Sequence, residues 1–137
     1  VRHPADCTFS CFAQNFEMND SMANFYTIKD SMSFYDKSLD LWDYYNKTLD
    51  LNVYYIHYSD IIQDFKNQIS NLLYFLGLEW EEDLFDYYKK KSNISTPSYS
   101  QVIQKPYEKS INRWKNYENY ININILEKWI DYFGYGK

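Results

Sequence analysis

Residues 51–58, Leu-Asn-Val-Tyr-Tyr-Ile-His-Tyr, form one nearly continuous stretch of apolar and β-forming side chains. Such a run is typical of a strand that is buried on both faces, as in a parallel sheet. One strand cannot form a stable sheet by itself, because its backbone groups need neighbouring strands. We therefore predict an α/β domain whose other strands lie upstream of Val1, with residues 1–2 as the end of one of them.

The stretches around this predicted strand repeat apolar side chains at intervals of three and four, which predicts amphipathic helices. Asp30 or Ser31 is expected to cap the longest helix, and Gly77 to end the following one. No repeat or linker interrupts the pattern, so one domain over residues 1–137 is expected. The predicted helices span 4–16, 31–48, 59–76, 81–91, 107–116 and 123–133, with loops over 17–29 and 92–106.

The composition narrows the class of protein. Of 137 residues, 45% are hydrophobic, and only 3 are Gly and 3 are Pro, as in a folded domain. A net charge of −5 disfavours a broad nucleic-acid surface, and no apolar run approaches the roughly 20 residues of a membrane span. Cys7 and Cys11 lie one helical turn apart, where a disulfide rarely fits, so we expect a reducing, cytoplasmic location.

A metal site is disfavoured as well. His3, Cys7 and Cys11 follow one another at intervals of four on one predicted helix. Ligands spread over about 12 Å of helix lie too far apart to share one zinc ion. The two cysteines are therefore expected to be small, buried helix residues.

The first twelve residues, Val-Arg-His-Pro-Ala-Asp-Cys-Thr-Phe-Ser-Cys-Phe, indicate a phosphate site. Arg2 offers a planar fork for two phosphate oxygens, and Ser10 adds a hydroxyl eight residues later. The N-terminus of the helix that follows adds aligned N–H groups. The alternative is an ordinary turn into a helix with an arginine on the surface.

This segment resembles the 3′-phosphate-binding segment of sulfotransferases that use 3′-phosphoadenosine 5′-phosphosulfate (PAPS), in particular a bacterial branch fused to tetratricopeptide repeats and related to tyrosylprotein sulfotransferases. Four later blocks resemble that family in the same order. The strand that ends in Tyr-Glu-Asp in the family ends here in Tyr58-Ser59-Asp60, with Ser59 in place of the acid. The other resembling blocks are the helix and Leu-Gly-Leu-x-Trp of 69–80, the nucleotide-covering loop of 96–107, and the Ser-x-x-Arg-Trp-x-x-Tyr block of 110–117.

The resemblance implies that this chain is the C-terminal part of a P-loop-type sulfotransferase domain, mostly helical with one or two parallel strands. It implies a whole protein that transfers a sulfonate from PAPS to a hydroxyl or amine acceptor without a metal. Carried over residue by residue, it assigns Arg2 and Ser10 to the 3′-phosphate of PAPS or adenosine 3′,5′-bisphosphate, and Tyr58 to the adenine. It assigns Arg113 to a phosphate and places Ser98 near the nucleotide.

The same resemblance assigns no residue of this chain to the catalytic step. The family's phosphate loop contains glycine, but the first glycine here is Gly77, and the family's catalytic His or Glu lies upstream of the Arg2 segment. We therefore expect no transferase activity from this chain alone. Residues 101–115 carry a charge of +3, leaving −8 on the rest, which suits either an anionic ligand or a solvated helix face.

Two other classes of protein are alternative interpretations of this sequence. A non-catalytic helical interaction module would explain the aromatic residues as core and interface, but not the order of the resembling blocks. An exposed core would then favour a homodimer. A P-loop kinase or other nucleotide transferase shares the expected architecture, but it needs acidic metal ligands beside a phosphate loop.

Overall fold

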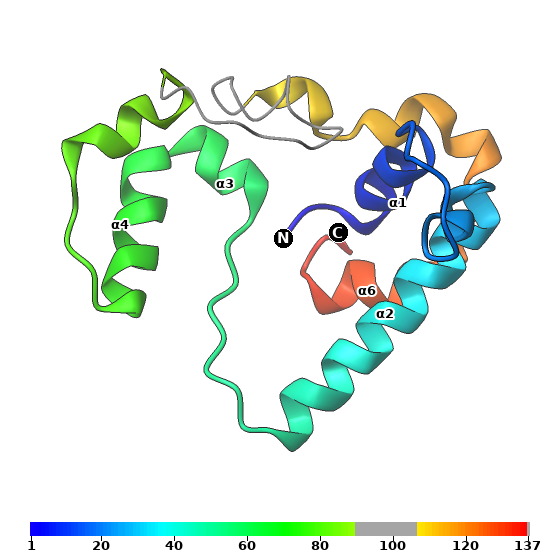
Figure 1. The fold of residues 1–137 in the computed structure, drawn as a ribbon, viewed down its shortest axis with the longest axis horizontal. Coiled ribbons are helices and arrows are strands. Elements are labelled where there is room, and N and C mark those ends of the chain that lie inside the picture. The colour runs from blue at the N-terminus through cyan, green and yellow to red at the C-terminus, as the bar shows by residue number, and fades with distance from the viewer. Residues whose placement is uncertain (90–106, 137) are drawn as a thin grey trace. The chain divides into compact units, whose positions relative to one another are not determined.

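The computed structural model describes residues 1–89 and 107–136 (Figure 1). The chain divides into two compact units: unit 1 comprises Val1–Val53 and Lys109–Lys137, and unit 2 comprises Tyr54–Glu108. The N-terminal and C-terminal segments of unit 1 lie side by side, with the ring centres of His3 and Tyr135 5.1 Å apart.

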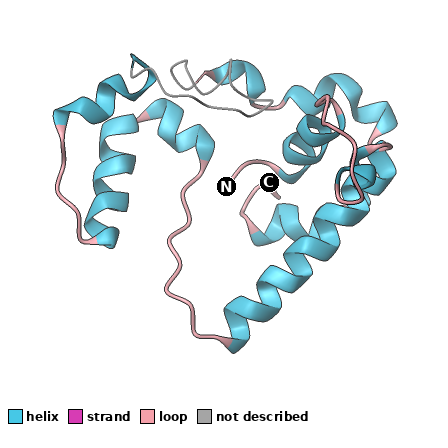
Figure 2. Cartoon of the chain, viewed as in Figure 1, coloured by secondary structure: helices cyan, strands magenta, loops and turns pink. Residues whose placement is uncertain are grey.

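The predicted α/β fold with one or two parallel strands is wrong, because the described residues contain helices and loops but no strand (Figure 2). Residues 51–57 and 1–3 have no regular secondary structure. β-Forming side chains favour extended backbone, but a strand also needs a neighbour for its N–H and C=O groups. The predicted burial of the stretch is wrong as well, since Leu51 and Tyr55 are 39% and 41% exposed.

In unit 1, helix α1 (Pro4–Phe12) packs against helix α2 (Ile28–Thr48). Pro4 occupies the first turn of α1, and the Nδ1 atom of His3 accepts a hydrogen bond from the N–H of Ala5. α1 ends earlier than the predicted residue 16. α2 begins three residues earlier than predicted, because Thr27 caps it by accepting from the N–H of Asp30.

The remaining helices of the first unit are short. A single 3₁₀ turn lies in the predicted loop of 17–29. The predicted helix of 123–133 consists of a 3₁₀ turn followed by a helix. Gly134, at φ 74°, terminates that helix. None of the described helices is both long enough and apolar enough to cross a bilayer. These elements are η1 (Met22–Phe25), η4 (Arg113–Tyr120), η5 (Ile123–Ile125) and α6 (Glu127–Tyr132), while η3 (Glu108–Ser110) begins at the end of unit 2.

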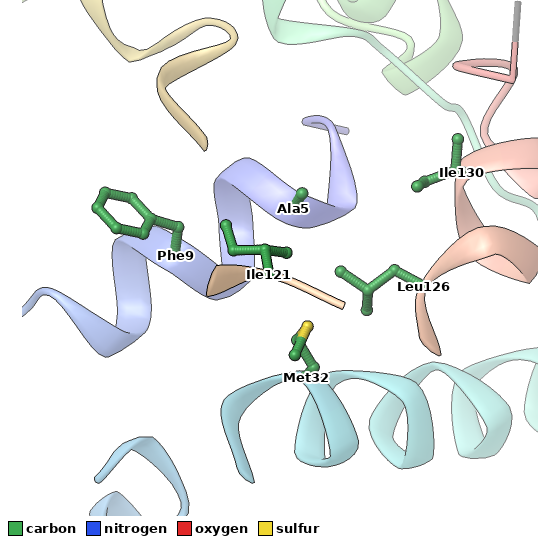
Figure 3. Packing of buried hydrophobic residues seen from close by; sticks show 6 residues of the cluster. All are labelled: Ala5, Phe9, Met32, Ile121, Leu126 and Ile130. Carbon is green, nitrogen blue, oxygen red and sulfur yellow. The ribbon is translucent and has the colours of Figure 1, made fainter. Parts of the chain in front are cut away.

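The core of unit 1 joins the beginning of the chain to its end. Figure 3 shows Met32 reaching from α2 toward Ile121 and Leu126, which lie beside α1. Trp129 of α6 is fully buried, and its Nε1–H donates to the carboxylate of Asp36 on α2 at 2.7 Å. The buried apolar residues that form this cluster are Ala5, Phe9, Met32, Ile121, Leu126 and Ile130.

Unit 2 contains α3 (Tyr58–Gln63), α4 (Phe65–Leu76) and η2 (Glu82–Lys89). The single helix predicted over 59–76 is broken at Asp64, which has φ −144° and caps α4 through the N–H of Asn67. Gly77 ends α4 at φ 68°, as predicted. No described residue of unit 2 is fully buried, so its apolar side chains remain partly exposed to solvent.

Leu126→Ala is expected to lower the free energy of unfolding by about 2–5 kcal/mol, because the side chain is fully buried in unit 1. Leu41→Ala is the matched control, since Leu41 is 51% exposed on α2 and its loss should change stability by about 0.5 kcal/mol or less. Urea denaturation followed by circular dichroism measures both. Equal losses for the two variants would show that Leu126 does not lie in a packed core.

Candidate functional site

Helix α1 has two different faces. Ala5 and Phe9 face the core, whereas Cys7, Ser10 and Cys11 lie on the opposite side and are half-buried. Burial raises the pKa of both thiols, and the charge of Arg2 opposes the rise at each of them. The charge of Arg2 therefore acts on the two cysteines of this face.

Arg2 also contacts the C-terminal part of unit 1. Its Nη2 atom donates a hydrogen bond to the backbone carbonyl of Ser110 at 3.1 Å, across 108 positions of sequence. Ser110 is the first residue of the predicted block Ser110–Tyr117. The two outermost resembling blocks of the sequence are thus in direct contact.

Asp6 forms the second connection between α1 and this block. Its carboxylate is only 4% exposed and accepts two backbone hydrogen bonds, from the N–H of Asn112 at 2.8 Å and from that of Trp114 at 2.9 Å. Asn112 has a left-handed backbone with φ 57°, which turns the chain there. The turn of residues 110–114 is therefore attached to the N-terminal segment by both Arg2 and Asp6.

Arg113 lies between the two N–H groups that Asp6 binds. Its guanidinium carbon is 5.2 Å from the centre of the Phe9 ring, which is the geometry of a cation–π contact. Phe9 in turn stacks on Tyr117 at 4.3 Å. The exposed Arg113 thus lies against the same helix that carries Ser10.

His3 and Trp114 stack at the same junction, with ring centres 5.1 Å apart and an interplanar angle of 16°. Burial lowers the pKa of His3; the nearby Lys115 acts in the same direction, while the charge of Asp6 opposes the shift. A pocket of about 360 Å³ opens beside this stack, lined also by Glu127, Asp131 and Tyr135 among others. No sequence pattern indicated this pocket.

Of the five predicted site residues, Arg2, Ser10 and Arg113 belong to unit 1. Ser10 lies on α1, Arg113 lies over the Phe9 ring of α1, and Arg2 bonds to the Ser110 carbonyl. Tyr58 belongs to unit 2, where its hydroxyl accepts from the N–H of Tyr107 at 3.2 Å and lies 3.4 Å from the carbonyl oxygen of the same residue. Ser98 and the predicted loop of 101–106 lie outside the described residues.

The resembling motif Arg-x-Pro-x-Asp includes Asp6, but sequence reasoning gave this residue no role. An acid in the first turn of a helix complements the helix dipole without any tertiary partner. Its burial depends on residues more than 100 positions away. In the part of the chain that the structure describes, no group of three or more His, Cys, Asp or Glu side chains has a metal-binding arrangement, and both cysteines are free thiols.

Comparison with known proteins assigns the chain to a family. The model of a family described as the sulfotransferase family matches residues 1–82, more than half of the chain. The chain belongs to the sulfotransferase family. The match includes Arg2, Ser10 and Tyr58 and ends before Ser98 and Arg113.

One relative of this sulfotransferase-family chain is an uncharacterized protein of Aquifex aeolicus (strain VF5), which is 33% identical over 75 residues. The aligned part covers 53% of the chain but 10% of the relative, so the chain spans about a tenth of that protein's length. No solved structure matches the chain.

The lowered pKa of His3 predicts a dependence of stability on pH. Since the folded state holds His3 neutral below the usual value of 6.5, the unfolded state binds the extra proton first as pH falls. We expect the free energy of unfolding to decrease as pH falls from about 6.5 to the pKa of His3 in the folded state. His3→Asn should remove this pH dependence while keeping a side chain that can cap α1. Urea midpoints at several pH values and an NMR titration of the His3 ring measure it. A His3 pKa at or above 6.5 in the folded protein would contradict the assignment.

Proposed function

We propose that this chain forms the 3′-phosphate and adenine side of the nucleotide site in a sulfotransferase that transfers a sulfonate from PAPS to a hydroxyl or amine acceptor. Membership of the sulfotransferase family supports the class of reaction. The observation that best supports the role of this chain is the hydrogen bond from Arg2 to Ser110, which joins the segment of Arg2 and Ser10 to the turn that carries Arg113.

The side chains present suit a phosphate group. Arg2 and Arg113 each offer several N–H donors with a permanent positive charge, and the Ser10 hydroxyl donates one more hydrogen bond. The neighbouring carboxylate of Asp6 accepts hydrogen bonds from two backbone N–H groups. A 3′-phosphate would meet the donors of Arg2, Arg113 and Ser10.

On the strength of the sequence resemblance, Tyr58 is proposed to contact the adenine. The bonds between its hydroxyl and the backbone of Tyr107 fix one end of the side chain. Stacking of a base on an aromatic ring is a common mode of base recognition, and a tyrosine ring is suited to it. Ser98 is proposed to lie near the nucleotide on the strength of the sequence resemblance alone.

Bound PAPS supplies the activated sulfonate, and this chain's residues would bind and orient the nucleotide end that does not react. No residue of the chain is assigned as catalytic base, and the first glycine is Gly77, so a glycine-containing phosphate loop at the start of the chain is absent. We propose that activity requires residues outside these 137, and that the chain alone does not transfer sulfonate.

A helical interaction module is the second candidate. Its supporting observation is the exposed apolar surface of α2, where Leu41, Tyr44 and Tyr45 are 51%, 61% and 44% exposed. This surface suits a second copy of the chain. Sedimentation of the chain at several concentrations tests the homodimer, and it is independent of nucleotide binding.

Adenosine 3′,5′-bisphosphate is expected to bind the chain, and Arg2→Ala or Ser10→Ala to weaken binding roughly 10- to 100-fold, the size of one or two lost charge-assisted hydrogen bonds. Isothermal titration calorimetry measures both. Ser10→Ala is the cleaner variant, because Arg2 also bonds to the Ser110 carbonyl.

The matched controls are Ser38→Ala and Lys47→Ala on α2, which remove a hydroxyl and a positive charge from exposed positions away from α1. Neither should change the affinity. Adenosine 5′-phosphate lacks the 3′-phosphate, so its binding should be indifferent to all four substitutions. The proposal fails if the chain does not prefer the bisphosphate, or if Arg2→Ala and Ser10→Ala leave that preference intact.

A further inference from the structure

The buried carboxylate of Asp6 has an unusual pair of partners. It binds the N–H groups of Asn112 and Trp114, the residues on either side of Arg113, with one oxygen for each. Hydrogen bonds to an ionised carboxylate are stronger than neutral ones, and a carboxylate that is 4% exposed depends on them. Asp6 therefore fixes the backbone on both sides of the arginine.

The turn that carries Arg113 needs such support. Asn112 holds a left-handed backbone at φ 57°, which is less favourable than the right-handed region for a residue with a side chain. The third attachment of the turn is the bond from Arg2 to the Ser110 carbonyl. All three hydrogen bonds come from the segment that carries Arg2 and Asp6, so they hold the turn against that segment.

This arrangement orders the side chain of Arg113. Its side chain is exposed and long, and ordering such a side chain costs entropy when it binds a ligand. With its backbone fixed by Asp6, the guanidinium rests over the Phe9 ring at 5.2 Å before any ligand arrives. Preorganised donors bind an anion more tightly than mobile ones.

An acid beside a phosphate site would ordinarily repel the ligand. Asp6 lies in the first turn of α1, close to the positive end of the helix, and its two oxygens face backbone N–H groups. Its charge is therefore largely compensated by donors that cannot reach the ligand.

We propose that Asp6 is a positioning residue, which acts on nucleotide binding through Arg113 by holding the 110–114 turn against α1. This inference rests on the proposed function for its ligand, a 3′-phosphate. It assigns no contact between Asp6 and the nucleotide.

Asp6→Asn tests the role, because an amide keeps the size of the side chain but can accept from only one of the two N–H groups. We expect affinity for adenosine 3′,5′-bisphosphate to fall about tenfold, and affinity for adenosine 5′-phosphate to change less than about twofold. Asp30→Asn is the matched control, since Asp30 occupies the first turn of α2 and should change neither.

A double-mutant cycle separates positioning from general damage. If Asp6 acts through Arg113, Asp6→Asn in an Arg113→Ala background should cost little further affinity for the bisphosphate. Losses that simply add, or an equal loss for the two nucleotides, would overturn the inference.

The turn can also be perturbed from the other side, which covers the case in which Asp6→Asn does not fold. Asn112→Ala disfavours the left-handed backbone and leaves Asp6 intact, whereas Asn112→Gly tolerates that backbone. The alanine variant should reproduce the selective loss and the glycine variant should keep the wild-type affinity. Equal affinities for the two variants would count against the inference.

Amide hydrogen exchange distinguishes this inference from the proposed function. Asp6→Asn should accelerate exchange at Asn112 and Trp114, broaden the Nε–H signal of Arg113, and leave the amide of the core residue Leu126 protected. If the wild-type chain does not bind the bisphosphate, the proposed function fails. Accelerated exchange at Asn112 and Trp114 in Asp6→Asn would still support the positioning of Arg113. Unchanged exchange at Asn112 and Trp114 would overturn the positioning role whatever the nucleotide does.

Discussion

A single buried carboxylate connects the two distant parts of unit 1. Asp6 binds the backbone at Asn112 and Trp114, 106 and 108 positions away. Closing a chain over such a distance is entropically unfavourable, so the contacts that close it must be strong. The apolar cluster joins the same two parts of unit 1, since Ile121 and Leu126 pack with Ala5 and Phe9 of α1 and Met32 of α2.

The helices were largely predictable, because three–four spacing of apolar residues is a local signal. α2 and the stop at Gly77 follow from such signals, whereas the break at Asp64 does not, since the pattern continues through it. The strand predicted for 51–58 failed for the opposite reason. Its composition suits a strand, but a strand forms only when it pairs with another strand. The described residues contain no such partner.

The site was predictable only in part. Arg2 and Ser10 stand close together in sequence, so one motif could indicate both, and family likeness by itself brought in Arg113. What joins them is tertiary: the Arg2–Ser110 bond and the Asp6 carboxylate depend on a turn whose left-handed residue, Asn112, has no distinctive neighbours in the sequence. The nucleotide-binding roles of Arg2, Ser10, Tyr58, Ser98 and Arg113 all remain predictions.

The core described above has a consequence for synthesis. Met32 and Ala5 leave the ribosome early, but their partners Leu126 and Ile130 follow only after all of unit 2 has been made. Until then α1 and α2 present uncovered apolar faces, which is the condition under which nascent chains engage chaperones or aggregate. The order of translation thus makes unit 1, although it contains the first residue, the last part of this chain to reach its final packing.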